Sequence, residues 1–257
     1  MDTDTPMEAE FDAMPGWTAD AVASLGAGYA VPAACRGSAS PAALTWLASR
    51  CRLEAGTRLV DVGGGMGGPA AHAREEHGVR PLLVDPMPGA CRAARRMFGI
   101  PAVVGTGAQL PVVSARADAA WCVGVLCTTA EKAAVLDEIH RVLVPGARLG
   151  LFVLVADGGD GHGADVEGAP EGNDFPTRDE LARLLDDARF RLVESVDLAD
   201  LPGPPRSWQD RIARVDALVE ARHGHEAAWQ CTREQEERLS RLLGTGRLTG
   251  VLLCAET

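Results

Sequence analysis

From about residue 57 onward, two patterns of hydrophobic and polar positions follow each other in turn along the chain. Short apolar runs are followed by stretches in which apolar residues recur every three or four positions, as in strands followed by helices. This alternation predicts a parallel sheet covered by helices. The expected strands are 57–62, 80–85, 101–104, 117–122, 148–155, 190–196 and 249–255, and the expected helices are 67–77, 88–98, 130–143 and 177–188.

The pattern predicts a single α/β domain over residues 1–257, with a doubly wound, mostly parallel seven-stranded Rossmann-like sheet. The last strand is expected to be antiparallel to its neighbour. Residues 1–55 contain amphipathic patches and are expected to form an N-terminal helical cap. Residues 204–246 are expected to form a helical insert, or lid, before the last strand. The core then comprises residues 56–203 and 247–257.

Composition narrows the range of partners. The formal net charge is -11, and an acidic surface repels phosphate backbones and anionic lipids, so we expect neither nucleic acid nor membrane as a partner. The seven cysteines are scattered without metal-ligand spacing, which indicates reduced thiols and no metal site. Signal-peptide and membrane-span patterns are absent, so a cytoplasmic protein is expected, with monomer and homodimer both open.

The segment RLVDVGGGMGGP places a glycine loop between an expected strand and an expected helix. Glycines let the backbone approach a ligand closely, and a helix N-terminus favours negative groups. Gly63, Gly65 and Gly67 match G-x-G-x-G, whereas Gly63, Gly65 and Gly68 match the dinucleotide fingerprint G-x-G-x-x-G. Asp61 favours a ligand with an ammonium group, because a carboxylate beside a pyrophosphate would repel it.

This segment resembles motif I of class I S-adenosylmethionine-dependent methyltransferases. Four later segments, LLVD, VVGTGAQLP, DAAWCVGVL and HRVLVPG, resemble the same family in the same order. The helical insert before the final strand is similar to that of the small-molecule type, which acts on sterols, quinones and natural products. The resemblance therefore implies S-adenosylmethionine as cofactor, S-adenosylhomocysteine as product and a small-molecule acceptor.

The resemblance also implies a cofactor site. It assigns the glycine loop and Asp61 to the amino-acid end and Asp85 to the ribose hydroxyls. It places Thr106 and Gly107 near the adenine, although the family often has an acidic residue where Thr106 stands. The residues expected to bind the cofactor on this basis are Asp61, Gly63, Gly64, Gly65, Gly67, Asp85, Pro86, Met87, Thr106, Gly107, Cys122 and Val123.

Four further residues are weaker candidates. Tyr29, the only tyrosine, and Arg36 lie in the expected cap and are carried as cofactor-binding residues. Arg36 suits a bidentate clamp on the cofactor carboxylate, and equally suits an ordinary surface position. His162 and Asp157 lie in the Gly- and Asp-rich segment 156–174, where each is a candidate general base or simply part of a solvated loop. The sequence assigns no other catalytic residue.

The function expected from these features is methyl transfer to an O, C or N atom of a small molecule, in specialised metabolism. A sulfonium methyl group is already reactive, so the protein mainly has to align the reactants and exclude water. One alternative is a methyltransferase-like domain that binds the cofactor but catalyses another reaction or acts as a scaffold. A second is an NAD(P)-dependent oxidoreductase, opposed by Asp61 and by the lack of a Tyr-x-x-x-Lys pair.

Overall fold

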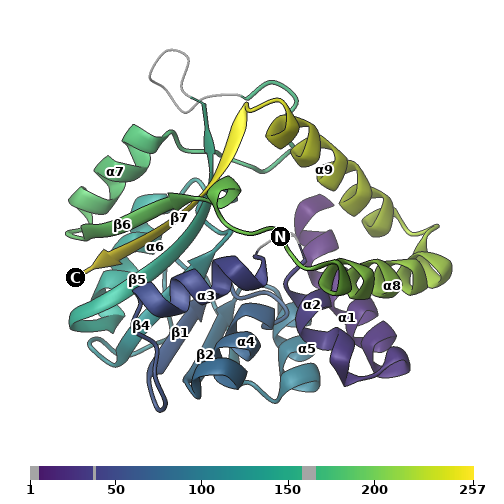
Figure 1. The fold of residues 1–257 in the computed structure, drawn as a ribbon, viewed down its shortest axis with the longest axis horizontal. Helices are drawn as coiled ribbons and strands as arrows, with labels where there is room; N and C mark the ends of the chain where they lie inside the picture. Colours follow the sequence, from purple (N-terminus) through teal and green to yellow (C-terminus); the bar gives the residue numbers. More distant parts are fainter. Residues whose placement is uncertain (1–5, 37–38, 158–165) are drawn as a thin grey trace, which may run out of the picture.

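The computed structural model describes residues 6–36, 39–157 and 166–257, and side chains from residue 11 onward. It contains one seven-stranded sheet in the order β3-β2-β1-β4-β5-β7-β6 (Figure 1). Strand β7 is antiparallel to both β5 and β6, whereas the other neighbouring strands are parallel. The strands are β1 Arg58–Val62, β2 Arg80–Asp85, β3 Ala102–Val104, β4 Ala117–Val123, β5 Leu143–Ala156, β6 Arg191–Asp197 and β7 Leu248–Glu256.

Helices cover both faces of this sheet, which confirms the predicted doubly wound fold. Alternate residues of a strand point to opposite faces, so Leu59 and Leu83 face α3, α4 and α5 while Val60 and Val84 face α6 and α7. The helices are α1 Pro6–Leu25, α2 Ala30–Ala34, α3 Pro41–Arg50, α4 Gly68–His77, α5 Pro88–Phe98, α6 Lys132–Val142, α7 Arg178–Asp187, α8 Arg206–His223 and α9 Ala227–Gly244, with short 3-10 helices η1 Ala27–Tyr29 and η2 Leu198–Asp200.

Local sequence signals set the ends of the helices that flank the site. Helices α4 and α5 each begin with proline in the first turn, where its missing N–H costs nothing. They end at Gly78 and Gly99, which adopt the left-handed conformation that closes a helix. A capping box between Thr177 and Glu180 starts α7. These signals are local, which is why the sequence predicts these elements to within two residues.

A separate helical layer stands at one side of the sheet, formed by α1, η1, α2, α8 and α9 (Figure 1). Its interior contains Met14, Val22, Val215, Val219 and Trp229, all buried. The expected cap and insert therefore pack on each other rather than acting as separate covers.

Helix α3 does not join this layer, although its residues fall inside the expected cap. Leu44 and Leu47 pack with Trp121 and Phe152 on the sheet. Its apolar stripe matches the sheet face, so the cap itself comprises α1, η1 and α2. Within the described residues, no helix has both the length and the apolar character that crossing a bilayer requires.

Candidate functional site

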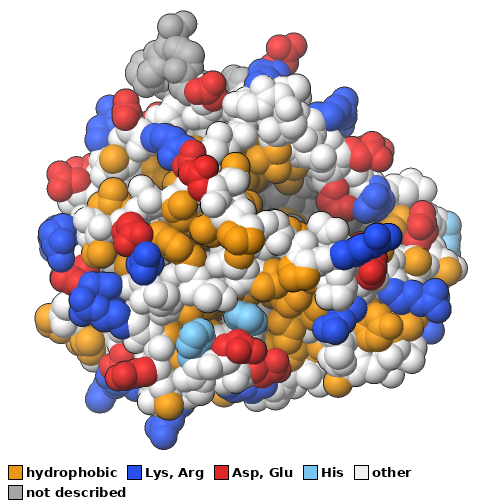
Figure 2. Space-filling model, in the orientation of Figure 1, with side chains coloured by type: hydrophobic (Ala, Val, Ile, Leu, Met, Phe, Trp, Pro, Cys, Tyr) orange, Lys and Arg blue, Asp and Glu red, His pale blue; other side chains and the backbone are white. Residues whose placement is uncertain are grey.

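A cavity of about 380 Å³ lies at the carboxyl ends of β1, β2, β4 and β5, beneath α1 and α9. Open α/β sheets bind ligands at this edge, at the point between β1 and β4 where the strand order reverses. Figure 2 shows this face hollowed, with hydrophobic side chains bordering the hollow. The volume is in the range of small-molecule sites.

The glycine loop forms the floor of this cavity. Gly63, Gly64 and Gly65 line it, and Gly63 and Gly65 have positive φ angles of 65° and 54°. An added Cβ at Gly64 would lie 2.6 Å from Oδ2 of Asp61, so only glycine fits above that carboxylate. Gly67 does not line the cavity; it is the left-handed N-cap residue that precedes α4.

Asp61 lines the cavity from the end of β1 and is completely buried. Neither carboxylate oxygen has a hydrogen-bond partner in the described structure, although the Ala70 amide is near enough to favour the charged form. Burial, reinforced by the Asp85 carboxylate, raises the pKa of Asp61 to about 7. Buried carboxylates normally have a partner, so this geometry fits a cationic ligand group entering from the cavity.

Asp85 lines the cavity at the end of β2 and is 6% exposed. Its Oδ2 accepts a hydrogen bond from Gly65 N at 2.8 Å, and its Oδ1 accepts one from Met87 N at 2.9 Å. Burial raises the pKa of Asp85, and these two amides oppose the shift. A carboxylate has about four acceptor positions, so the two oxygens retain capacity for ligand hydroxyls.

Of the other residues expected to bind the cofactor, three line the cavity and one lies in the core. Pro86, Met87 and Val123 line the cavity. Cys122 does not: it is completely buried in the core on the α6 side of the sheet. Strand alternation explains this correction, because the side chain preceding Val123 must point to the opposite face.

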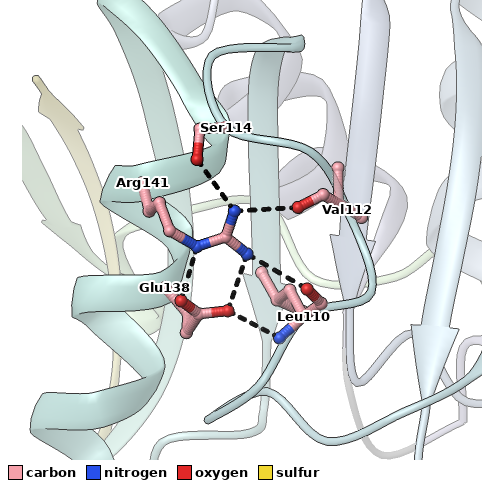
Figure 3. Close-up of polar contacts among 5 residues, drawn as sticks. All are labelled: Leu110, Val112, Ser114, Glu138 and Arg141. Carbon is pink, nitrogen blue, oxygen red and sulfur yellow. Dashed lines mark hydrogen bonds and ion pairs between the residues drawn. The ribbon is translucent and has the colours of Figure 1, made fainter.

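The expected adenine segment follows β3, and a polar cluster on α6 holds its later part (Figure 3). Arg141 donates to the carbonyl oxygens of Leu110 and Val112 at 3.0 and 2.9 Å and to Ser114 Oγ at 3.1 Å. Glu138 pairs with Arg141 at 2.6 Å and accepts from Leu110 N at 2.7 Å. The cluster therefore ties the loop between β3 and β4 to α6.

Thr106 and Gly107, in this same segment, do not line the cavity. Thr106 is exposed, and the position of a Cβ at Gly107 faces Val62 and Val135, on the α6 side. The loop leaves the three-residue strand β3 and turns toward α6, which carries these residues away from the cavity. Their expected contact with adenine is therefore not brought about in this structure.

Of the two candidate cofactor-binding residues in the cap, only one lines the cavity. Tyr29 is half-buried and packs among cap and insert side chains rather than lining the cavity. Arg36 does line it, but its guanidinium pairs with Asp216 of α8, and its Nε lies 3.6 Å from Oε1 of Glu236 of α9. The Arg36 guanidinium, for which a clamp on the cofactor carboxylate was one of two expected roles, therefore faces two carboxylates of the protein itself.

Of the two candidate bases, only Asp157 lies within the described residues. Asp157 is exposed and absent from the cavity wall, and its N–H donates to the carbonyl oxygen of Arg247. His162 lies outside the described residues. His140 packs edge-on against Phe190, and burial lowers its pKa, in keeping with a structural role.

Sequence reasoning missed the other half of the cavity wall. Apolar side chains from α1, β5 and α9 form it, and they come from three distant parts of the chain. They are Phe11, Met14, Pro15, Phe152, Leu154 and Leu239. The amphipathic pattern of α9 predicted a lid, but nothing local to these residues signals which ones meet over the glycine loop.

An ion pair braces the wall where β4 and β5 end. Lys132, the only lysine in the sequence, is buried and pairs with Asp174 at 2.6 Å. It also donates to the carbonyl oxygen of Thr129 at 2.8 Å. The pair joins the segment after β4 to the segment before α7, and these carry the cavity-lining residues Thr128 and Asn173.

Comparison with known proteins shows which proteins this chain is similar to. Residues 60–151 match the sequence model of the methyltransferase domain family. An O-methyltransferase from Pyrenophora dematioidea is 30% identical over 162 residues, which are 58% of this chain and 60% of that protein. A 24-methylenesterol C-methyltransferase 2 from Oryza sativa subsp. japonica is 28% identical over 185 residues, covering 65% of this chain and 49% of the relative. The chain thus spans about half to three fifths of these relatives.

Solved structures share the fold. The [4+2]-cyclase SpnF superposes with a TM-score of 0.66 and 21% identity, over 83% of this chain and 80% of that chain. These findings confirm the predicted resemblance to class I small-molecule methyltransferases and the predicted Rossmann-like fold.

Proposed function

We propose that this class I methyltransferase domain transfers the methyl group of S-adenosylmethionine to an O, C or N atom of a small-molecule acceptor, in specialised metabolism. The observation that carries the proposal is Asp61, a buried cavity carboxylate without a hydrogen-bond partner, beside a glycine loop that only glycine can form. The net charge of -11 supports a small molecule, rather than nucleic acid or an anionic membrane, as partner, and a cytoplasmic location is part of the proposal.

The described residues fit the cofactor. S-adenosylmethionine, when bound, supplies an electrophilic sulfonium methyl group together with an ammonium group. Asp61 would pair with the ammonium group, and the free acceptor positions of Asp85 would hold the ribose hydroxyls. Pro86 and Met87 line the adjoining wall, where an adenine would lie.

The protein's contribution to the reaction is then positioning and exclusion of water. Apolar side chains of α1 and α9 close the cavity opposite the glycine loop, and aligned reactants lose much of their entropic barrier. Cys127 lines the cavity, and burial raises the pKa of its thiol, so it stays protonated and does not act as a base. An acceptor whose own atom is nucleophilic suits this site.

A second candidate is a cofactor-binding domain that catalyses a reaction without methyl transfer. Within the described residues, the apolar wall carries no histidine, and its carboxylate, Glu236, faces Arg36. This favours the second candidate, because the wall offers no evident general base. The structural neighbour described as a [4+2]-cyclase is one protein with this fold and another reaction.

Two measurements test the proposal. Calorimetric titration with S-adenosylmethionine, S-adenosylhomocysteine and NAD(P)H should give micromolar binding of the adenosyl compounds only. Incubation with S-adenosylmethionine and an acceptor library should release S-adenosylhomocysteine together with a methylated product. Selective nicotinamide binding would overturn the proposal, and product formation with unconsumed S-adenosylmethionine would favour the second candidate.

A further inference from the structure

The charged side chains that line the cavity are mostly acidic. Arg36 is the only cationic side chain that lines the cavity within the described residues. The parts of the sequence outside the described residues contain no lysine or arginine, so they contribute no side-chain cation of that kind. Asp61, Asp85 and Glu236 also line the cavity, so carboxylates outnumber the guanidinium.

Arg36 is moreover withheld from a ligand. Its side chain is 13% exposed and pairs with Asp216, while Glu236 lies on its other side. Glu236 itself pairs with Arg233 at 2.5 Å, and the charges of these four residues cancel. An anion entering the cavity would have to compete with the carboxylates already placed beside Nη1 and Nε of Arg36.

The wall facing the glycine loop offers little polar recognition. Met14 and Phe152 are almost fully buried, and Leu154 and Leu239 are half-buried. The uncharged polar side chains that also line the cavity donate to other protein atoms. The hydroxyls of Thr232 and Thr128 donate to the carbonyl oxygens of Ala228 and Val125, each at 2.9 Å. The side-chain amides of Asn173 and Gln235 donate to the carbonyl oxygen of Pro170 and to Sγ of Cys231, each at 3.3 Å. Transferring a charged group to such a wall without a partner is strongly unfavourable, whereas an apolar surface gains free energy on burial.

We propose that the acceptor side takes an uncharged, largely apolar molecule and excludes anions, with Glu236 and Asp216 keeping Arg36 from acting as an anion site. This inference rests on the proposed function, because the cofactor's place defines which part of the cavity is left for the acceptor. Glu236 is thereby a specificity-determining residue, although it forms no part of the glycine loop or the two strand-end acids.

Binding of two probes of matched shape tests the substrate class. Protein saturated with S-adenosylhomocysteine is titrated with 2-naphthalenemethanol, which is neutral, and with 2-naphthoate, its carboxylate counterpart. We expect the alcohol to bind at least about tenfold more tightly, since the carboxylate loses its hydration without gaining a partner. Equal or tighter binding of 2-naphthoate would overturn the inference, as would failure of the alcohol to bind up to its solubility limit.

Variants test the role assigned to Glu236. In Glu236→Gln, the affinity for 2-naphthoate should rise several-fold relative to that for the alcohol. Glu237→Gln makes the same change at the next residue of α9, which is exposed and does not line the cavity, and should alter neither affinity. If circular dichroism shows Glu236→Gln folded and its preference equals that of wild type, Glu236 does not withhold Arg36.

Titrating the same probes without S-adenosylhomocysteine separates this inference from the proposed function. A chain that fails to bind the adenosyl compounds but still prefers the neutral probe would lose the methyltransferase proposal and keep the charge preference. A chain that binds the adenosyl compounds but prefers the anion would keep the methyltransferase proposal and lose the charge preference.

Discussion

The two sides of the cavity are built in opposite ways. The cofactor side comes from two short contiguous segments, 61–65 and 85–87, joined by the hydrogen bond from the Gly65 amide to Asp85. On the acceptor side, Arg36 and Glu236, which lie 200 positions apart in the chain, meet through side chains alone. The backbone sets the positions of the polar groups on the first side. Only packing between distant segments brings together the charges and apolar surfaces of the second.

Removing the charge of Asp61 should have the largest effect on the cofactor side. Asp61→Asn keeps the shape of the side chain but loses a charge-assisted hydrogen bond, so S-adenosylhomocysteine affinity should fall by about 2–3 kcal/mol, roughly 30- to 150-fold. Isothermal titration calorimetry measures this. The melting temperature of the ligand-free protein should not fall at pH 8, because the variant removes a buried carboxylate without a partner.

Asp118→Asn is the matched control for this prediction. Asp118 lies on β4, the strand beside β1, pairs with Arg58 at 2.5 Å, and is more than a third exposed. The substitution should leave cofactor affinity unchanged. Equal losses of affinity in both variants would show that the effect of Asp61→Asn is a general disturbance of the sheet.

Asp85→Ala should weaken S-adenosylhomocysteine binding by about 1–3 kcal/mol through lost ribose hydrogen bonds. Part of this loss is indirect, because Asp85 also accepts from the Gly65 amide and so holds the glycine loop. An analogue without ribose hydroxyls separates the two contributions: it should bind wild type less tightly than the natural compound, and the difference should shrink in the variant. If the affinity difference between the two compounds is as large in the variant as in wild type, Asp85 does not bind the ribose.

The raised pKa of Asp61 predicts how cofactor affinity depends on pH. The ligand ammonium group needs the ionised carboxylate, so affinity should rise with pH, level off above about 7, and fall by about tenfold per unit below it. Asp61→Asn should lack this slope. A wild-type profile without a slope between pH 5.5 and 8 would contradict the assigned pairing.

The same pKa shift acts on stability with the opposite sign. The folded-state pKa of Asp61 lies above the value near 4 expected in the unfolded chain. Between these values the folded protein holds a proton that the unfolded chain has released, so this group makes the ligand-free protein less stable as pH rises from about 4 to 7. Melting curves of wild type and Asp61→Asn should diverge across this window.

The smallest effects are expected on the free energy of unfolding, from variants that break ion pairs. They test whether an ion pair beside the acceptor wall contributes more than an exposed one. Lys132→Met removes a buried partner of Asp174 beside the acceptor wall and should lower the free energy of unfolding by about 1–2 kcal/mol. Arg178→Met breaks the exposed pair with Asp197 at the β6 edge of the sheet and should cost less than about 0.5 kcal/mol. Urea denaturation measures both, and equal costs would remove the bracing role of Lys132.

Much of the cofactor side was predictable because its signals are contiguous. The apolar runs, the glycine loop and the acids ending two strands lie in order along the chain, and parallel strands necessarily bring their carboxyl ends to one edge. The sequence alone therefore predicts that Asp61 and Asp85 share one site. The two-residue period of a strand also implies that Cys122 and Val123 face opposite ways, but choosing which one reaches the cavity needed the orientation of β4.

Tertiary packing alone decided the rest. Whether Arg36 clamps a ligand or pairs with protein carboxylates depends on the docking of α8 and α9, which no spacing in the sequence encodes. The direction of the loop carrying Thr106 depends on Arg141 and Glu138, which are distant from it in the chain. By itself the sequence determined the fold and the acids of the cofactor side. Only the tertiary structure decided the acceptor side, because its charges cancel and its apolar side chains meet through contacts between distant segments.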